Sequence, residues 1–261
     1  MAIVSTFCKK GGVGKTTLIG YLAHYHAMQG KTVLVISVDD QNSIFKLFGK
    51  DGFIDERQDN YFEHYLAGET KREEIVCEAR DGMYLIKTLN TDTLSLNLTL
   101  QRAQEKKLRN VINDFSQYFD YIFIDFPPSS SRLSEILLDI SENIVLVVGL
   151  DTLGLDGFKN TLQYFVDSDI DLDKISYIIP NNYNPIKRTP KACLDTLKKQ
   201  AKEYTPKAKI TTPMNELAII KNLQAEGVSI FDNYDIKDRF HNKNRQRAYT
   251  ELESLYKTIE L

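Results

Sequence analysis

Short apolar runs alternate with amphipathic stretches along much of the chain. Near-continuous apolar runs predict buried strands at residues 2–7, 31–39, 83–88, 120–125, 144–148 and 175–179. Apolar residues recur every three or four positions in the stretches 18–25, 101–115 and 155–165, which is typical of helices. Strands that alternate with helices predict an α/β fold, with a doubly wound, mostly parallel sheet flanked by helices.

Residues 44–80 follow this pattern less clearly. The segments 59–67 and 72–79 look helical. Leucines at positions 94, 96, 98 and 100 alternate with other residues as in a strand, but the helical stretch 101–115 follows directly. We therefore expect a loop at 94–100 that leads into that helix.

The composition is that of an ordinary globular protein. A chain of 261 residues suits one domain at 1–261, and a first strand at residue 2 predicts no N-terminal helix-turn-helix domain. The net charge of −3 argues against a surface coated for nucleic acid, but a local basic patch remains compatible with it. Three scattered cysteines, no signal peptide and no membrane-spanning apolar run predict a cytoplasmic protein.

The strongest chemical signal is the glycine-rich segment 8–17, which joins the first predicted strand to the first predicted helix. Glycines let the backbone approach phosphates, and loop N–H groups at a helix N-terminus attract anions. Lys15 can reach the β- and γ-phosphates, and the Thr16 hydroxyl can bind Mg²⁺. The segment therefore predicts a nucleotide site built from Gly11, Gly12, Val13, Gly14, Lys15, Thr16 and Thr17.

This loop departs from the standard phosphate-binding loop. The pattern Gly-x4-Gly-Lys-Thr would place its first glycine at Lys9, and a second lysine, Lys10, directly precedes the glycine pair. The resulting Lys-Gly-Gly-x-Gly-Lys-Thr resembles the deviant Walker A loop of the ParA/MinD family of ATPases, most of all the small partition ATPases. The resemblance implies ATP and Mg²⁺ as cofactors, ATP hydrolysis, and an ATP-dependent homodimer in which Lys10 reaches the partner's nucleotide.

The turn after the second predicted strand extends the resemblance. Asp39 and Gln41 match the second Asp and the Gln of the family's Asp-x-Asp-Pro-Gln turn, whereas Ser37 and Asp40 replace its first Asp and its Pro. The family match implies that Asp39 positions the attacking water. The lost carboxylate at Ser37 puts part of the family's hydrogen bonding around Mg²⁺ in question.

Later segments carry the same resemblance. Asp125 ends an apolar strand and precedes two prolines, like the family's Walker B aspartate, which would hold Mg²⁺ through a water. Asn181 and Asn182 are both candidates for the asparagine that contacts adenine, and the segment 210–214, with Pro213, resembles the one that closes over the base. Lys15, Asp39, Asp125 and Asn181 all follow strands, so a parallel sheet places them at one edge.

Three functional classes remain to be compared. A metal-cluster relative would need paired cysteines, which this chain lacks. A MinD-like ATPase that positions machinery at a membrane needs a basic amphipathic C-terminal helix, and here the segment 249–261 is acidic, so a membrane partner is not expected. A partition ATPase that binds non-specific DNA on the nucleoid needs basic surfaces. In such ATPases a centromere-binding, ParB-like partner stimulates hydrolysis.

Two basic stretches favour the partition class. Each could equally be a solvated helix face. The first comprises Lys187, Arg188, Lys191, Lys198, Lys199, Lys202, Lys207 and Lys209. The second comprises Lys237, Arg239, His241, Lys243, Arg245 and Arg247. We therefore expect a ParA-like ATPase for plasmid or chromosome segregation, with MinD-like positioning as the alternative.

Overall fold

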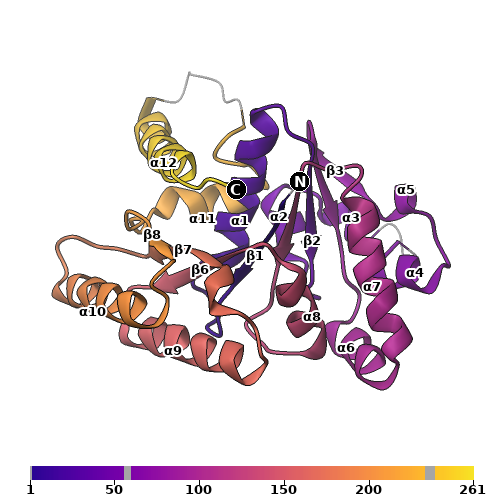
Figure 1. Cartoon of the computed structure of the whole chain (residues 1–261). Coiled ribbons are helices and arrows are strands. Elements are labelled where there is room, and N and C mark those ends of the chain that lie inside the picture. The colour runs from indigo at the N-terminus through magenta and orange to yellow at the C-terminus, as the bar shows by residue number, and fades with distance from the viewer. Residues whose placement is uncertain (1, 56–59, 233–238) are drawn as a thin grey trace.

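The computed structural model describes residues 2–55, 60–232 and 239–261. Its described strands form one sheet in the order β3-β4-β2-β5-β1-β6-β7-β8 (Figure 1). The strands are β1 (Ala2–Phe7), β2 (Val33–Ser37), β3 (Cys77–Arg80), β4 (Met83–Ile86), β5 (Tyr121–Asp125), β6 (Asn143–Gly149), β7 (Ile175–Asn181) and β8 (Lys209–Ile210). Neighbours are parallel except β3 and β4, which confirms the predicted α/β class.

Helices cover both faces of this sheet (Figure 1). One face packs against α1 (Lys15–Met28), α2 (Ser43–Leu47), α3 (Asp51–Asp55), α11 (Ala218–Ala225) and α12 (Arg239–Lys257). The other face packs against α4 (Phe62–Ala67), α5 (Arg72–Ile75), α6 (Thr91–Leu100), α7 (Arg102–Phe115), α8 (Arg132–Ile140), α9 (Thr152–Asp167) and α10 (Arg188–Tyr204). A short 3-10 helix, η1 (Leu172–Lys174), precedes β7.

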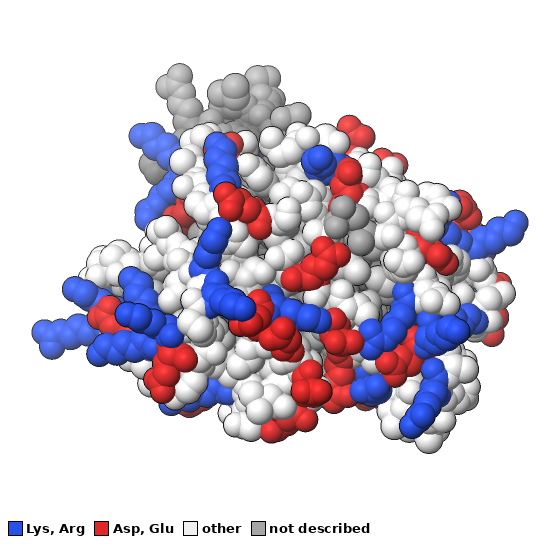
Figure 2. All heavy atoms as spheres, viewed as in Figure 1, with Lys and Arg blue, Asp and Glu red and all other residues white. Residues whose placement is uncertain are grey.

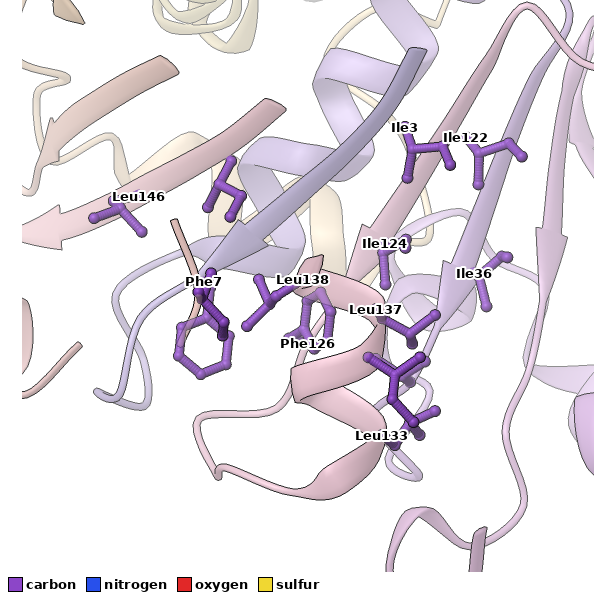
Figure 3. Packing of buried hydrophobic residues seen from close by; sticks show 14 of the residues in the cluster. Ile3, Phe7, Ile36, Ile122, Ile124, Phe126, Leu133, Leu137, Leu138 and Leu146 are labelled. Atoms are coloured by element: carbon purple, nitrogen blue, oxygen red, sulfur yellow. The ribbon is translucent and has the colours of Figure 1, made fainter. Parts of the chain in front are cut away.

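The central strands are apolar on both sides because each face is covered. In β1, Val4 faces the α1 side, whereas Ile3 and Phe7 face the α8 side. Figure 3 shows Leu133 and Leu137 of α8 on that side of the sheet, near Ile124 of β5. Burial of each such side chain contributes about 1.5–3 kcal/mol. Because a strand covered on both faces gains this energy at successive positions, it is apolar throughout, and the near-continuous apolar runs predicted these strands correctly.

Two predictions between residues 72 and 100 are wrong. Residues 77–80 form β3, an antiparallel edge strand paired with β4, whereas the sequence suggested a helix through 79. The expected loop at 94–100 is helix α6, which the Asn90 side chain caps by accepting from the backbone N of Thr93 (2.8 Å). Leu94 and Leu98 are buried one turn apart, while Leu96 and Leu100 are exposed. The alternating leucines therefore include the i, i+4 pair of a helix face, although their spacing of two residues suggested a strand.

Two helices begin earlier than expected. Helix α9 starts at Thr152 because the Asp151 side chain accepts a hydrogen bond from the backbone N of Gly154 (2.6 Å), an N-cap that the pattern of apolar positions did not reveal. Helix α12 starts at Arg239, so Lys243 and Arg247 belong to the terminal helix itself. Lys237 of the second basic stretch lies outside the described residues.

Candidate nucleotide-binding site

The glycine-rich loop joins β1 to the N-terminus of α1, as its sequence predicted. Gly12 and Gly14 have φ angles of 72° and 96°, a region that residues with a Cβ rarely adopt. Asn181, at the end of β7, donates from its side-chain amide to the Val13 carbonyl (2.8 Å). A Cβ on Gly14 would lie 2.6 Å from that amide nitrogen, so glycine is required for the loop to close against β7.

A cavity of about 340 Å³ opens above this loop, at the carboxyl edge of the sheet. Nine of the residues predicted from the sequence line it: Gly11, Gly12, Gly14, Lys15, Thr16, Thr17, Asp39, Asn181 and Asn182. Val13, Lys10, Asp125 and Pro213 do not line it. Its volume suits one small organic ligand, and its phosphate-binding loop makes a nucleotide the fitting class.

The remaining walls come partly from the predicted segments at 125–128 and 210–214 and partly from residues that carry no recognisable motif. They are Leu18, Phe126, Pro128, Met214, Asn215, Glu216, Leu217, Ile220, Lys221 and Gln224. The base-covering segment was predicted at 210–214, but the lining begins at Met214 and continues into α11. Gln224 of α11 donates from its side-chain amide to the Thr17 hydroxyl. The local sequence does not predict this contact, because it joins residues 207 positions apart.

Lys15 is a buried cation without a paired anion among the described residues. Its side chain is buried, and its Nζ donates to the Lys10 carbonyl (3.2 Å). No carboxylate of the described residues lies within ion-pairing distance of Nζ. Burial lowers the pKa of Lys15, because the charged ammonium has lost water without gaining a paired anion. Bound phosphates would restore this missing partner.

Asp125 lies below the cavity floor and is 1% exposed. Its Oδ1 accepts a hydrogen bond from the Thr16 hydroxyl (3.1 Å), and its Oδ2 has no hydrogen-bond partner among the residues that the structure describes. Burial, together with the nearby Asp39 carboxylate, raises the pKa of Asp125 to about 7. An orphaned buried oxygen beside a hydroxyl fits Mg²⁺, a hard cation that prefers oxygen ligands and bound waters.

Asp39 and Asp40 occupy different positions in the turn after β2. Asp39 lines the cavity, and its Oδ1 accepts from the backbone N of Gln41 (3.0 Å). Asp40 is exposed and accepts from the Gln41 side chain (3.1 Å). Ser37, which replaces the family's first aspartate, donates to the Asp39 carbonyl (3.1 Å), so it supports the turn without supplying a carboxylate.

Lys10 does not line its own cavity. A Cβ on Gly157 would lie 2.7 Å from the Lys10 Cβ, which places Lys10 against α9. The preceding residue, Lys9, donates from its backbone N to the Thr161 hydroxyl of α9 (2.9 Å). The loop is therefore supported by α9 on the side away from the cavity.

These side chains can carry out phosphoryl transfer to water when a nucleotide and its metal are bound. The metal would be held by Thr16 and by Asp125, and it would supply charge neutralisation at the phosphate oxygens. Lys15 and the loop N–H groups would hold the phosphate chain and stabilise charge that develops on it. Asp39, at the cavity wall, can orient or accept a proton from a water. Fold and site together define a P-loop nucleotide-binding protein.

Comparison with known proteins narrows the class to one family. The family model AAA_31, described as an AAA domain, matches residues 1–173. The cell division protein PomZ of Myxococcus xanthus is 25% identical over 227 residues, which cover 85% of this chain and 69% of PomZ. The chromosome-partitioning ATPase Soj of Thermus thermophilus is 31% identical over 154 residues, which cover 59% of this chain and 57% of Soj.

Solved structures share the fold over nearly the full length. A McdA variant of Cyanothece in complex with ATP has a TM-score of 0.78 at 18% identity, covering 100% of this chain and 98% of McdA. MinD of Pyrococcus horikoshii with Mg-ADP has a TM-score of 0.71 at 19% identity, covering 99% of this chain and 96% of MinD.

The chain belongs to the ParA/MinD family of deviant Walker A ATPases. It is thus an ATP hydrolase whose cofactors are ATP and Mg²⁺, in agreement with the donor set of the cavity.

Proposed function

We propose that this chain is a ParA-like partition ATPase. ATP bound between two subunits creates a homodimer that binds DNA non-specifically, and hydrolysis, stimulated by a centromere-binding adaptor, releases it. Plasmid or chromosome segregation is the process that this cycle would serve. The similarity to Soj, a chromosome-partitioning ATPase, supports this class.

The observation that carries the proposal is a row of exposed basic side chains on and just before α10. Figure 2 shows Lys and Arg side chains projecting over this helix, at the left of the view. All of them are exposed, and none has an ion pair with another described residue: Lys187, Arg188, Lys191, Lys198, Lys199 and Lys202. Unpaired lysines and arginines are free to neutralise backbone phosphates, which is the main source of non-specific DNA binding.

Three of the other basic residues are less available. Lys207 pairs with Asp173, and Lys209 pairs with Glu260 (3.2 Å). Arg245 is 8% exposed and donates to the Ser229 carbonyl (3.1 Å), so it connects α12 to the segment after α11. Lys243 and Arg247 of α12 are exposed, but more of the exposed basic residues gather on and just before α10, so α10 is the better candidate for the DNA surface.

Helix α12 argues against membrane positioning as in MinD. Its apolar residues Ala248, Leu252, Leu255 and Tyr256 are buried in the core cluster on the α1 side of the sheet, where α12 packs against α1 and α11. The Tyr256 hydroxyl also donates to the Leu18 carbonyl of α1 (2.8 Å). A membrane anchor would require this face to leave the core. Within the described residues, no helix combines the length and apolarity needed to cross a bilayer.

Charge reversal on α10 tests the proposal. K198E/K199E should retain ATP binding but lose most DNA affinity in a gel-shift assay with Mg-ATP. The slope of log affinity against log salt should also fall, by about 0.9 for each DNA phosphate that the variant no longer neutralises. The matched control is K106E/K107E on the exposed side of α7, which makes the same charge change far from α10 in the chain.

Three outcomes decide the matter. Equal DNA loss in both variants would mean a general charge effect and would remove α10 as the DNA surface. Wild-type protein that ignores DNA at low salt contradicts the partition proposal. If that protein instead pellets with anionic liposomes in ATP, membrane positioning is the better description.

A further inference from the structure

Glu251 of helix α12 makes two hydrogen bonds to a segment that lines the nucleotide cavity. Its Oε1 accepts a hydrogen bond from the backbone N of Asn215 (2.6 Å), and its Oε2 accepts from the Asn215 side-chain amide (3.0 Å). Asn215 belongs to the cavity-lining segment Met214–Leu217. Glu251 itself does not line the cavity. Glu251 therefore contacts the lining segment on the side away from the cavity.

The wall segment continues the sheet beyond β7. The backbone N of Tyr183 donates to the Met214 carbonyl (2.9 Å), and the backbone N of Glu216 donates to the Tyr183 carbonyl (3.1 Å). These bonds set the segment beside Asn181 and Asn182, which line the same part of the cavity. The backbone N of Met214 also donates to the Pro180 carbonyl (2.8 Å), so backbone bonds hold Met214 and Glu216, whereas the backbone N of Asn215 between them is held by Glu251.

Glu251 is carried by a helix that is itself packed into the core. The flanking residues Ala248, Leu252 and Leu255 of α12 are buried. The hydrogen bond from Tyr256 to Leu18 ties α12 to α1, the helix that begins at the phosphate-binding loop. Glu251 thus adds a link from the wall through α12 to α1, made of hydrogen bonds to a carboxylate, which are about twice as strong as neutral ones.

The cavity lining has two kinds of chemistry. One part of the lining comes from the glycine loop and Lys15, which suit phosphates. Another part of the lining carries Met214, Leu217 and Ile220 together with Asn182, and Asn181 lies between this part and the glycine loop, where its amide donates to Val13. Apolar side chains with a few amide groups suit a flat heteroaromatic base.

We propose that Glu251 is a positioning residue for nucleotide binding: it holds Met214–Leu217 where the base of ATP lies. This role for Glu251 rests on the proposed placement of ATP in this cavity. Glu251 touches neither base nor phosphate, so it sets the affinity for ATP through the pre-formed wall and leaves the chemical step unchanged.

Two ligands separate this role from a general effect on folding. Mg-ATP carries a base, whereas Mg-tripolyphosphate presents a similar phosphate chain without one. By calorimetry, E251A should bind Mg-ATP about tenfold more weakly and Mg-tripolyphosphate within twofold of wild type. In steady-state assays its KM for ATP should rise about tenfold with kcat within twofold. The matched control is E253A, two residues along the same helix, where the carboxylate pairs with Lys257 (3.0 Å) and should affect neither ligand.

A swapped pair gives a second, independent measurement. N215D places two carboxylates together and should weaken Mg-ATP binding as E251A does. N215D/E251Q has the wild-type charge and can restore both hydrogen bonds, so it should recover most of the ATP affinity. This comparison remains decisive if E251A is insoluble.

Several results would overturn the inference. They are unchanged ATP affinity in E251A and N215D, a parallel loss of ATP and tripolyphosphate affinity, or no recovery in the double variant. Wild-type protein that binds tripolyphosphate as tightly as ATP would show that the wall does not contact a base. Wild-type protein that binds neither ligand would instead refute the placement of ATP in this cavity.

Discussion

Asp125 gives the most quantitative prediction, because a buried carboxylate that awaits a metal weakens the ligand-free protein. Its pKa in the folded state is about 7, against a reference value of 3.8, mainly because of burial. Between these two values the folded state binds the proton more tightly than the unfolded state. The free energy of unfolding therefore falls as pH rises through this range. A pKa difference of roughly three corresponds to about 4 kcal/mol once the pH exceeds 7.

Asp125→Asn removes this titration while retaining an oxygen that can accept from Thr16. The free energy of unfolding of the variant, relative to wild type, should be higher at pH 8 than at pH 5 by about 3 kcal/mol. Any fixed cost of the buried amide is the same at both pH values and cancels. Burial lowers the pKa of His24 and His26, but these residues titrate in both proteins and cancel as well.

Urea denaturation followed by circular dichroism, without nucleotide and with a chelator, measures this difference. D195N is the matched control, since Asp195 is exposed on α10 and the same substitution should show no such pH dependence. Equal changes at pH 5 and pH 8 in D125N would refute the reasoning. Saturating Mg-ATP should then stabilise wild type by about 3 kcal/mol at a hundred times its Kd, and D125N by far less.

The remaining predictions concern three side chains of the site. Lys15→Ala should weaken Mg-ATP binding at least tenfold, since it removes the buried cation that meets the phosphates, and calorimetry that finds affinity within threefold of wild type would contradict this role. Asp39→Ala should keep ATP binding but slow turnover at least a hundredfold and prolong the ATP dimer. Unchanged turnover in a phosphate-release assay would shift attention to D40A. Lys10→Ala should leave monomer ATP affinity intact while weakening the dimer and its DNA binding. Sedimentation with ATP that shows a wild-type dimer would exclude a role for Lys10 across the interface.

Local sequence was sufficient wherever one physical requirement dominated a segment. The strands that carry the site are buried on both faces, so they must be apolar throughout, and β1, β2 and β5 were predicted for that reason. A loop that approaches phosphates must have glycine at positions of positive φ, and Gly12 and Gly14 satisfy this. The parallel order of these strands then brings Lys15 and Asp39 to one edge.

Only the tertiary structure decided features that depend on distant partners. The strand β3 forms because β4 offers an unpaired edge, and its own residues look equally suited to a helix. The cavity wall at Met214–Leu217 is positioned by Glu251, and the phosphate loop is held by Asn181. Asp125 and Asp40 also differ through burial, because Asp125 ends β5 inside the core whereas Asp40 lies exposed in the turn after β2. Hydrogen bonds between residues far apart in the chain leave no periodic pattern, so the sequence alone specifies the phosphate end of this site and the fold specifies the rest.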